Sequence, residues 1–181
     1  MTKEKYHDLE DDYINHILKY VKESGGLFPH ISIFAEDKDP EQTKPALIHI
    51  PIEDSYMEDD AGKERFIKNV LPGVFRALKE EFIPVGTAWA SEAWMRFPGK
   101  DFDPEKDNWK EIPIKKEVII IQTESDFGTS CVIYEIKREG KQINSDGELT
   151  DNVTLERLDD LKNPEHMSGR FSGLFNKLKK I

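Results

Sequence analysis

Carboxylates near the ends of predicted strands are the side chains of this chain with the clearest chemical potential. Paired carboxylates serve as general acids and bases, and clustered carboxylates hold Mg²⁺. Either use requires several strand ends to meet at one rim of a sheet, and with 36 acidic residues some carboxylates fall at strand ends by chance. The positions are Glu36, Glu53, Asp54, Glu92, Glu124 and Asp126, of which Glu92, Glu124 and Asp126 are the candidate catalytic residues.

Glu92 lies between Trp89 and Trp94 in the stretch 85–97. If this stretch is a strand, Glu92 shares a face with Trp94 and Arg96, because side chains alternate between the two faces. Arg96 can then pair with Glu92, which gives the carboxylate a structural role. Burial of Glu92 would instead favour its protonated form, as a general acid requires. Both interpretations stay open, and the structural one is simpler.

The stretch 98–113 is the first candidate binding surface. It is longer than an ordinary hairpin connection and shows no clear periodicity. Phe102 and Trp109 would be costly to expose on a mobile loop, so they either pack back on the body or form a recognition surface. With two residues of the preceding stretch, the candidate binding residues are Phe102, Trp109, Trp94 and Arg96.

Residues 165–181 predict a basic amphipathic helix. Its apolar stripe is Phe171, Leu174, Phe175, Leu178 and Ile181, and its basic side chains are Arg170, Lys177, Lys179 and Lys180, opposed by Glu165 alone. Such a helix can lie on a membrane, bind in the groove of a partner or dock on its own acidic body. Internal docking needs no further molecule and is the first of these alternatives.

No strong catalytic or cofactor-binding signature is present. The sequence lacks a dinucleotide fingerprint, a phosphate-binding GxxxxGK[ST] loop, an HExxH motif and a CxxC pair. None of the five histidines has a second histidine or a cysteine at metal-ligand spacing. They are His7, His16, His30, His49 and His166. The sequence therefore predicts no metal site and no cofactor.

Cys131 is the only cysteine, which excludes an intrachain disulfide and fits a reducing compartment. Within a predicted strand it is expected to be a buried thiol rather than a nucleophile. The first residues lack the apolar core of a signal peptide, and no window approaches the ~20 apolar residues of a membrane span. A cytoplasmic location is expected.

The composition favours a compact, strongly solvated domain. The 181 residues are 37% hydrophobic, 10% aromatic and 34% charged, which predicts one domain with an aromatic-rich core. The net charge of −10 disfavours nucleic acid as a partner, because affinity for nucleic acid comes largely from neutralising phosphates. An acidic surface can instead meet a basic protein, imitate a phosphate track or simply maintain solubility.

Periodicity predicts two long helices and five strands. The helices are 3–23, capped by Thr2 and ended by Gly25–Gly26, and 59–82, with a kink or two abutting helices at Pro72. The strands are 30–36, 46–52, 85–97, 116–124 and 129–138, the last two joined by a tight turn at 126–128. Residues 139–153 are expected to be turn-rich, and 155–161 to form one or two helical turns.

These elements predict an α+β domain in the order α-β-β-α-β-β-β-α, with a largely antiparallel sheet of about five strands and helices mainly on one face. Two functions remain open. The first is a non-catalytic cytoplasmic binding or regulatory protein that acts on a macromolecular partner, most simply another protein. The second is a small carboxylate-based enzyme, with or without a divalent metal. The sequence does not decide the oligomeric state.

Overall fold

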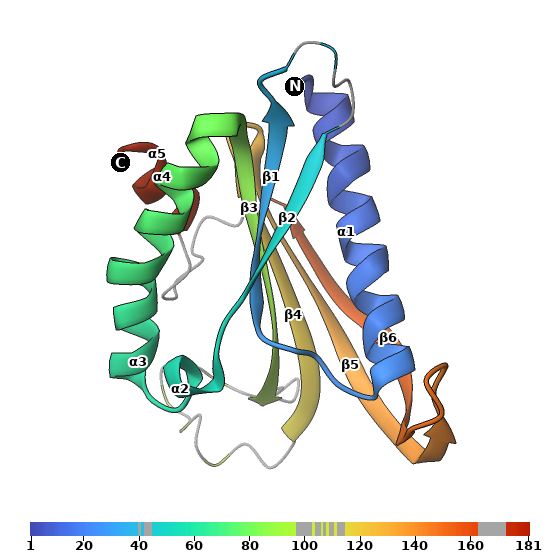
Figure 1. The fold of residues 1–181 in the computed structure, drawn as a ribbon. Helices are drawn as coiled ribbons and strands as arrows, with labels where there is room; N and C mark the ends of the chain where they lie inside the picture. The colour runs from blue at the N-terminus through green and yellow to red at the C-terminus, as the bar shows by residue number, and fades with distance from the viewer. Residues whose placement is uncertain are drawn as a thin grey trace.

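The structure is a computed structural model that describes residues 1–39, 41, 45–96, 103, 106, 108, 111, 115–162 and 173–181. Its centre is a six-stranded antiparallel sheet in the order β2-β1-β3-β4-β5-β6 (Figure 1). The strands are β1 His30–Asp37, β2 Ala46–Pro51, β3 Phe82–Arg96, β4 Lys115–Ser125, β5 Gly128–Ile143 and β6 Leu149–Lys162. The predicted α+β class and antiparallel sheet are confirmed, although the sheet has six strands rather than five.

β6 replaces a predicted turn-rich region and a predicted short helix. Leucines three residues apart suggested helical turns, but Leu155 and Leu158 lie on opposite faces of the strand. Leu155 packs with the cluster beneath the first helix, and Leu158 packs near Cys131 on the other face. The turn before β6 is held by Asn144, whose side-chain oxygen accepts the backbone N–H of Glu148 at 2.8 Å. The helical prediction was wrong because both faces of β6 find apolar partners.

Helix α1, Lys3–Ser24, covers one face of the sheet (Figure 1). Thr2 caps its start by accepting the backbone N–H of Lys5 at 3.3 Å, and Gly25 ends it with a left-handed φ of 78°. Both predicted ends are therefore confirmed. The helix buries Tyr6, Tyr13, Ile17 and Val21 on a sheet surface that includes Phe34, Ala88, Ala90, Ile119 and Ile121.

Further helices cover the opposite face, so α1 and the other long helical segment lie on different faces of the sheet, whereas the prediction placed the helices mainly on one face. The further helices are α2 Asp54–Met57, α3 Asp60–Arg65, α4 Leu71–Glu81 and α5 Leu174–Lys179. The buried side chains of α4, of α5 and of the turn that joins α3 to α4 pack on Ile31, Ile33, Ala35, Ile50 and Ile52. The side chains that these helices and the turn contribute are Phe66, Leu71, Phe75, Leu174, Phe175 and Leu178. β1 carries large apolar residues on both faces, because Ile33 and Phe34 alternate, and it therefore requires cover on both sides.

The break predicted at Pro72 is present. A π-helical turn, η1 Phe66–Val70, joins α3 to α4, and the N–H of Leu71 bonds the carbonyl of Phe66. Proline has no N–H to donate, so the wider turn and the new helix start accommodate Pro72 near the beginning of α4. The apolar stripe continues across this junction, which keeps the whole segment on the sheet.

The double-tryptophan stretch is strand β3, as predicted, despite its alanines. Gly86, Ala88 and Ala90 face α1, and Phe34 of the neighbouring strand lies opposite Gly86. Small side chains on this face let the helix approach the sheet closely. In the part of the chain that is described, no helix is long and apolar enough to cross a membrane.

Candidate functional site

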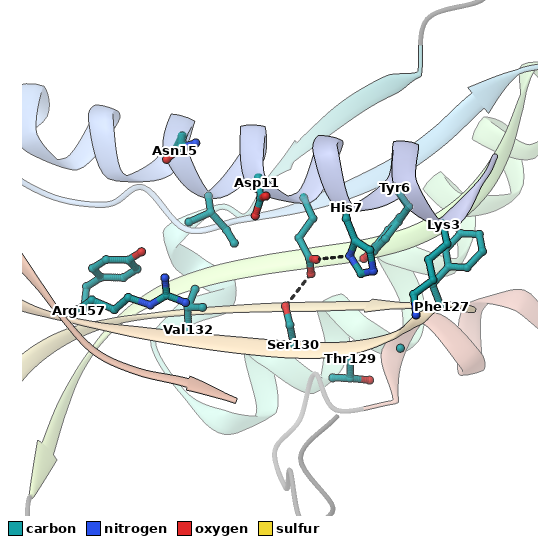
Figure 2. Close-up of a pocket in the computed structure, with 14 residues that line it drawn as sticks. Lys3, Tyr6, His7, Asp11, Asn15, Phe127, Thr129, Ser130, Val132 and Arg157 are labelled. Atoms are coloured by element: carbon teal, nitrogen blue, oxygen red, sulfur yellow. Dashed lines mark hydrogen bonds and ion pairs between the residues drawn. The ribbon is translucent and has the colours of Figure 1, made fainter. Parts of the chain in front are cut away.

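A cleft of about 570 Å³ lies between the first half of α1 and the first half of β5 (Figure 2). We call it the polar cleft. One wall is the α1 edge formed by Lys3, His7, Asp11 and Asn15, which recur every four residues and so lie along one line of the helix. The remaining lining residues are Tyr6, Glu10, Ile14, Phe127, Gly128, Thr129, Ser130, Val132, Tyr134 and Arg157.

Glu10 is the buried charge of the polar cleft. Its side chain belongs to a residue that is only 8% exposed. The carboxylate accepts hydrogen bonds from the hydroxyl of Thr123 on β4 and from the hydroxyl of Ser130 on β5, the latter at 2.6 Å. The two hydroxyls lie 2.8 Å apart. The β4–β5 hairpin and α1, whose contacting residues are 113 and 120 positions apart, thus converge on one carboxylate, which satisfies the rule that buried charges require partners.

His7 extends this cluster toward the outside. Its Nδ1 lies 3.1 Å from Oε2 of Glu10, on the oxygen that Ser130 does not use. The imidazole is about half exposed, so it joins a buried carboxylate to the surface of the cleft. Figure 2 shows Tyr6 and His7 on the α1 side and Ser130 opposite them on β5. A histidine that bonds a carboxylate can bind or relay a proton.

Tyr6 contributes a buried hydroxyl beside the same cluster. Its polar neighbours are Ser125 and Thr123, but among the described residues its oxygen has no hydrogen-bond partner. Burial raises the pKa of Tyr6 to about 12, so the hydroxyl is protonated under ordinary conditions. A buried polar group without a partner is uncommon in folded proteins and marks a place where a ligand or water can add a hydrogen bond.

The three candidate catalytic carboxylates lie outside the polar cleft. Glu124 is 7% exposed and accepts the backbone N–H groups of Gly173 at 2.6 Å and Phe175 at 3.1 Å. Asp126 pairs with Lys179 at 2.6 Å. Both therefore attach α5 to the sheet, and α5 buries its apolar side chains on the body of the protein.

Glu92 also has structural partners. Its carboxylate accepts the backbone N–H of Leu27 at 2.6 Å and lies 3.4 Å from the guanidinium of Arg138. The partner that the structure gives Glu92 is thus Arg138, where the strand pattern suggested Arg96. In the β3–β4 register, Glu124 lies opposite Thr87, and Glu92 lies five residues after Thr87. Five residues of a strand span about 17 Å, and the odd number places Glu92 and Glu124 on different faces of the sheet. The structure does not bring Glu92 together with Glu124.

Of the candidate binding residues, Trp94 and Arg96 lie near the end of β3. Trp94 is 67% exposed, which is unusual for so large an aromatic side chain. Arg96 is partly buried. Phe102 and Trp109 lie outside the described residues, as does most of 98–113.

The histidines and Cys131 have definite places. Cys131 is buried at 6% exposure, as predicted. His16, His30 and His49 gather at a second pocket, although nothing in their sequence spacing indicated it. Within the described part of the chain, no group of three or more His, Cys, Asp or Glu side chains is arranged to hold a metal ion.

Sequence reasoning did not single out Glu10, Ser130, His7 or Tyr6. One signal was available, because Glu10 falls between Tyr6 and Tyr13 on the buried stripe of α1, where a charged residue is out of place. Ser130 gave no such signal, since a hydroxyl in a strand is ordinary.

Comparison with models of protein families, with curated proteins and with solved structures found no match for this chain.

Proposed function

We propose that the protein is a non-catalytic binding protein, and that the polar cleft receives an extended segment of a partner protein. The observation that carries the proposal is the buried Glu10 cluster with the adjoining Tyr6 hydroxyl, both of which belong to the lining of the polar cleft. Binding sites typically combine a concave surface with a few polar groups that fix the orientation of the ligand.

The dimensions suit an extended peptide. The wall from Lys3 to Asn15 covers twelve steps of an α-helix, which corresponds to about 18 Å. An extended chain advances about 3.4 Å per residue, so about five residues fit along this wall. The groups available to hydrogen-bond such a segment include the exposed side chains of Asp11 and Asn15.

The charges favour a polypeptide over a nucleic acid. The polar cleft mixes basic residues, Lys3 and Arg157, with acidic residues, Glu10 and Asp11. A phosphate backbone would require a basic surface, and the chain as a whole has a net charge of −10. The proposal includes a cytoplasmic location. It also includes a second contact through Trp94, because exposed tryptophans are frequent anchors of protein interfaces.

A peptide-display selection followed by nuclear magnetic resonance tests the proposal. Peptides selected on the wild-type protein should shift the amide signals of 3–15 and 128–134. Asp11→Arg changes the charge of the cleft wall and should weaken these peptides at least about tenfold, which is about 1.4 kcal/mol. Asp12→Arg is the matched control, because Asp12 is exposed and does not line the cleft. Equal loss in both variants, or shifts confined to other surfaces, would reject the peptide site.

A small carboxylate-based enzyme is the second candidate function. It is favoured by the same cluster, because Glu10 with His7 could transfer a proton and the Tyr6 hydroxyl could donate a hydrogen bond to a substrate. A panel of chromogenic esters, phosphates and glycosides provides the test. Turnover that disappears in Glu10→Gln, while the fold is retained, supports the enzyme. Turnover that survives the substitution removes Glu10 as the catalytic residue.

A further inference from the structure

A second pocket, of about 360 Å³, lies on another edge of α1, away from the polar cleft. We call it the histidine pocket. Its lining residues are His16, Ile17, Tyr20, Phe28, His30, His49 and Pro51, which come from α1, from the connection to β1, and from β1 and β2. It is separate from the polar cleft, because none of the residues that the structure describes lines both. Three of these residues are histidines.

The three imidazole rings form one contiguous group. The ring centroids of His16 and His49 are 5.8 Å apart and nearly parallel, at 28°. The rings of His30 and His49 are 5.4 Å apart and meet edge to face. The histidines therefore share one local environment, and a charge on one of them affects the others.

Hydrogen bonds fix one of these rings and leave others available. The Nδ1 of His30 donates to the carbonyl of Phe28 at 2.9 Å, and its Nε2 lies 3.2 Å from the hydroxyl of Tyr13. His49 uses Nδ1 toward Ser32 at 2.8 Å. Among the described residues, the Nε2 of His49 and both ring nitrogens of His16 have no hydrogen-bond partner, so they can hydrogen-bond a ligand, and all of them donate when the rings are protonated.

The other lining residues are apolar or aromatic. Tyr20 and Phe28 are 42% and 49% exposed, so two rings reach the solvent at the same pocket. Planar aromatic ligands gain both apolar contact and ring–ring interaction from such a surface. A ligand that uses the whole pocket therefore needs an aromatic ring to contact Tyr20 and Phe28 and a polar group to hydrogen-bond the imidazoles.

No carboxylate of the described residues lines the histidine pocket, although the chain is strongly acidic. The charged groups nearest to His16 along α1 are Asp12 and Lys19, at helical spacings of four and three, and neither lines the pocket. Burial and the neighbouring imidazoles hold the pKa of His30 and His49 below the ordinary histidine value. Among the described residues, no carboxylate forms an ion pair with these imidazoles, so a bound anion would supply the counter-charge of a protonated ring.

We propose that the histidine pocket binds a small aromatic carboxylate, with its ring against Tyr20 and Phe28 and its carboxylate against the imidazoles of His16 and His49. Binding takes up protons, because the anion stabilises the charged imidazoles. The affinity for the ligand therefore rises as the pH falls. A neutral ligand of the same shape gains the ring contact only.

Phenylacetate and its neutral isostere phenylacetamide are the probes for this site. Each is titrated into the full chain at about pH 8 and about pH 6, with histidine ring signals and calorimetry as readouts. Phenylacetate should bind about tenfold more tightly at the lower pH, whereas the dissociation constant of phenylacetamide should change less than about twofold. The ring signal of His49, whose pKa is lowered by burial in the free protein, should titrate at higher pH when phenylacetate is bound.

Variants separate the two parts of the site. His16→Gln, at an exposed position, should remove most of the pH dependence, and Phe28→Ala should weaken both probes. Lys19→Gln is the control, because it removes a nearby positive charge from a residue that does not line the pocket. Equal binding of the two probes at both pH values would overturn the proposal. So would equal losses in His16→Gln and Lys19→Gln, since these would show a general attraction of anions to the surface.

Discussion

The carboxylate of Glu124 accepts the backbone N–H of Gly173 at 2.6 Å, across 49 positions of the sequence. The same side chain accepts the N–H of Phe175, and Gln122 donates to it from two residues away on β4. Glu124 thus satisfies the otherwise unpaired N–H groups at the start of α5. The sequence suggested Glu124 as a candidate catalytic residue. In the structure, its carboxylate attaches α5 to the sheet.

Glu124→Ala should lower the free energy of unfolding by about 2–3 kcal/mol, because buried N–H groups lose their acceptor. Amide hydrogen exchange in 174–179 should accelerate at the same time, since α5 is no longer held. Asp126→Ala is the matched control, because its ion pair with Lys179 is largely exposed and is worth less than about 1 kcal/mol. Equal effects of the two substitutions would show that Glu124 does not hold the helix.

Gly86→Ala should lower the free energy of unfolding by about 1–3 kcal/mol through overpacking. A Cβ atom at Gly86 would lie 2.8 Å from the backbone oxygen of Glu124 and 2.9 Å from Cε2 of Tyr6. Gly73→Ala is the opposite case, since nothing lies within 4 Å of a Cβ there and the site is helical. It should stabilise the protein by about 0.5–1 kcal/mol. Chemical denaturation measures both, and a neutral Gly86→Ala would contradict the close approach of α1.

Alternation and turn chemistry were sufficient to predict much of the sheet. Apolar residues on both faces of 118–121 indicated a covered central strand, and 126–128 indicated the hairpin turn between β4 and β5. The small residues at 86, 88 and 90 indicated a strand under a closely packed helix, which overrode the helical propensity of alanine. In each case the local pattern and the tertiary packing agree.

β6 and the candidate site could not be predicted in this way. A strand whose two faces both find apolar partners loses its simple alternation, and a register shift between Ile133 and Tyr134 disturbs it further. The Glu10 cluster depends on partners 113 and 120 positions away. The site forms only when tertiary folding brings α1 next to β4 and β5, so no local sequence pattern encodes it.

Tyr6→Phe should leave the free energy of unfolding near neutral pH unchanged or raise it by up to about 1 kcal/mol. The hydroxyl is buried without a hydrogen-bond partner among the described residues, so its removal relieves a desolvation cost. In the peptide experiment the same substitution should weaken binding, if the partner uses this hydroxyl. A loss of more than about 2 kcal/mol in stability would show that the hydroxyl is already bonded within the fold.

The raised pKa of Tyr6, about 12, gives a separate prediction at alkaline pH. The native state holds the tyrosine proton more tightly than the unfolded state, whose pKa is about 10. The stability from this group is therefore complete below about pH 10 and is lost as the pH rises through about 12. Wild-type stability should fall more steeply than that of Tyr6→Phe over this interval. Parallel pH profiles for the two proteins would contradict the assignment.

Arg138 and Lys141 are positively charged side chains that pair with Asp151 at the junction of α1, β5 and β6. The Nζ of Lys141 lies 2.5 Å from one carboxylate oxygen, and a guanidinium nitrogen of Arg138 lies 3.3 Å from the other. Arg138 also bonds the carbonyl of Gly25 at the end of α1 and pairs with Glu117 at 2.7 Å. The hydrogen bond from Lys141, followed by the charges of Lys141 and Arg138, holds the pKa of Asp151 below its ordinary value.

Lys141→Gln should therefore raise the pKa of Asp151, as carboxylate nuclear magnetic resonance can measure. A depressed carboxyl pKa contributes stability above the unfolded value of about 3.9, and this contribution is lost as the pH falls through the lower native value. The stability difference between wild type and Lys141→Gln should consequently be largest near neutral pH and disappear in acid. Lys137→Gln is the matched control on the same strand, because Lys137 pairs with Glu156 and should leave Asp151 unchanged. A difference that stays constant with pH would mean that Lys141 stabilises the junction by packing rather than by charge.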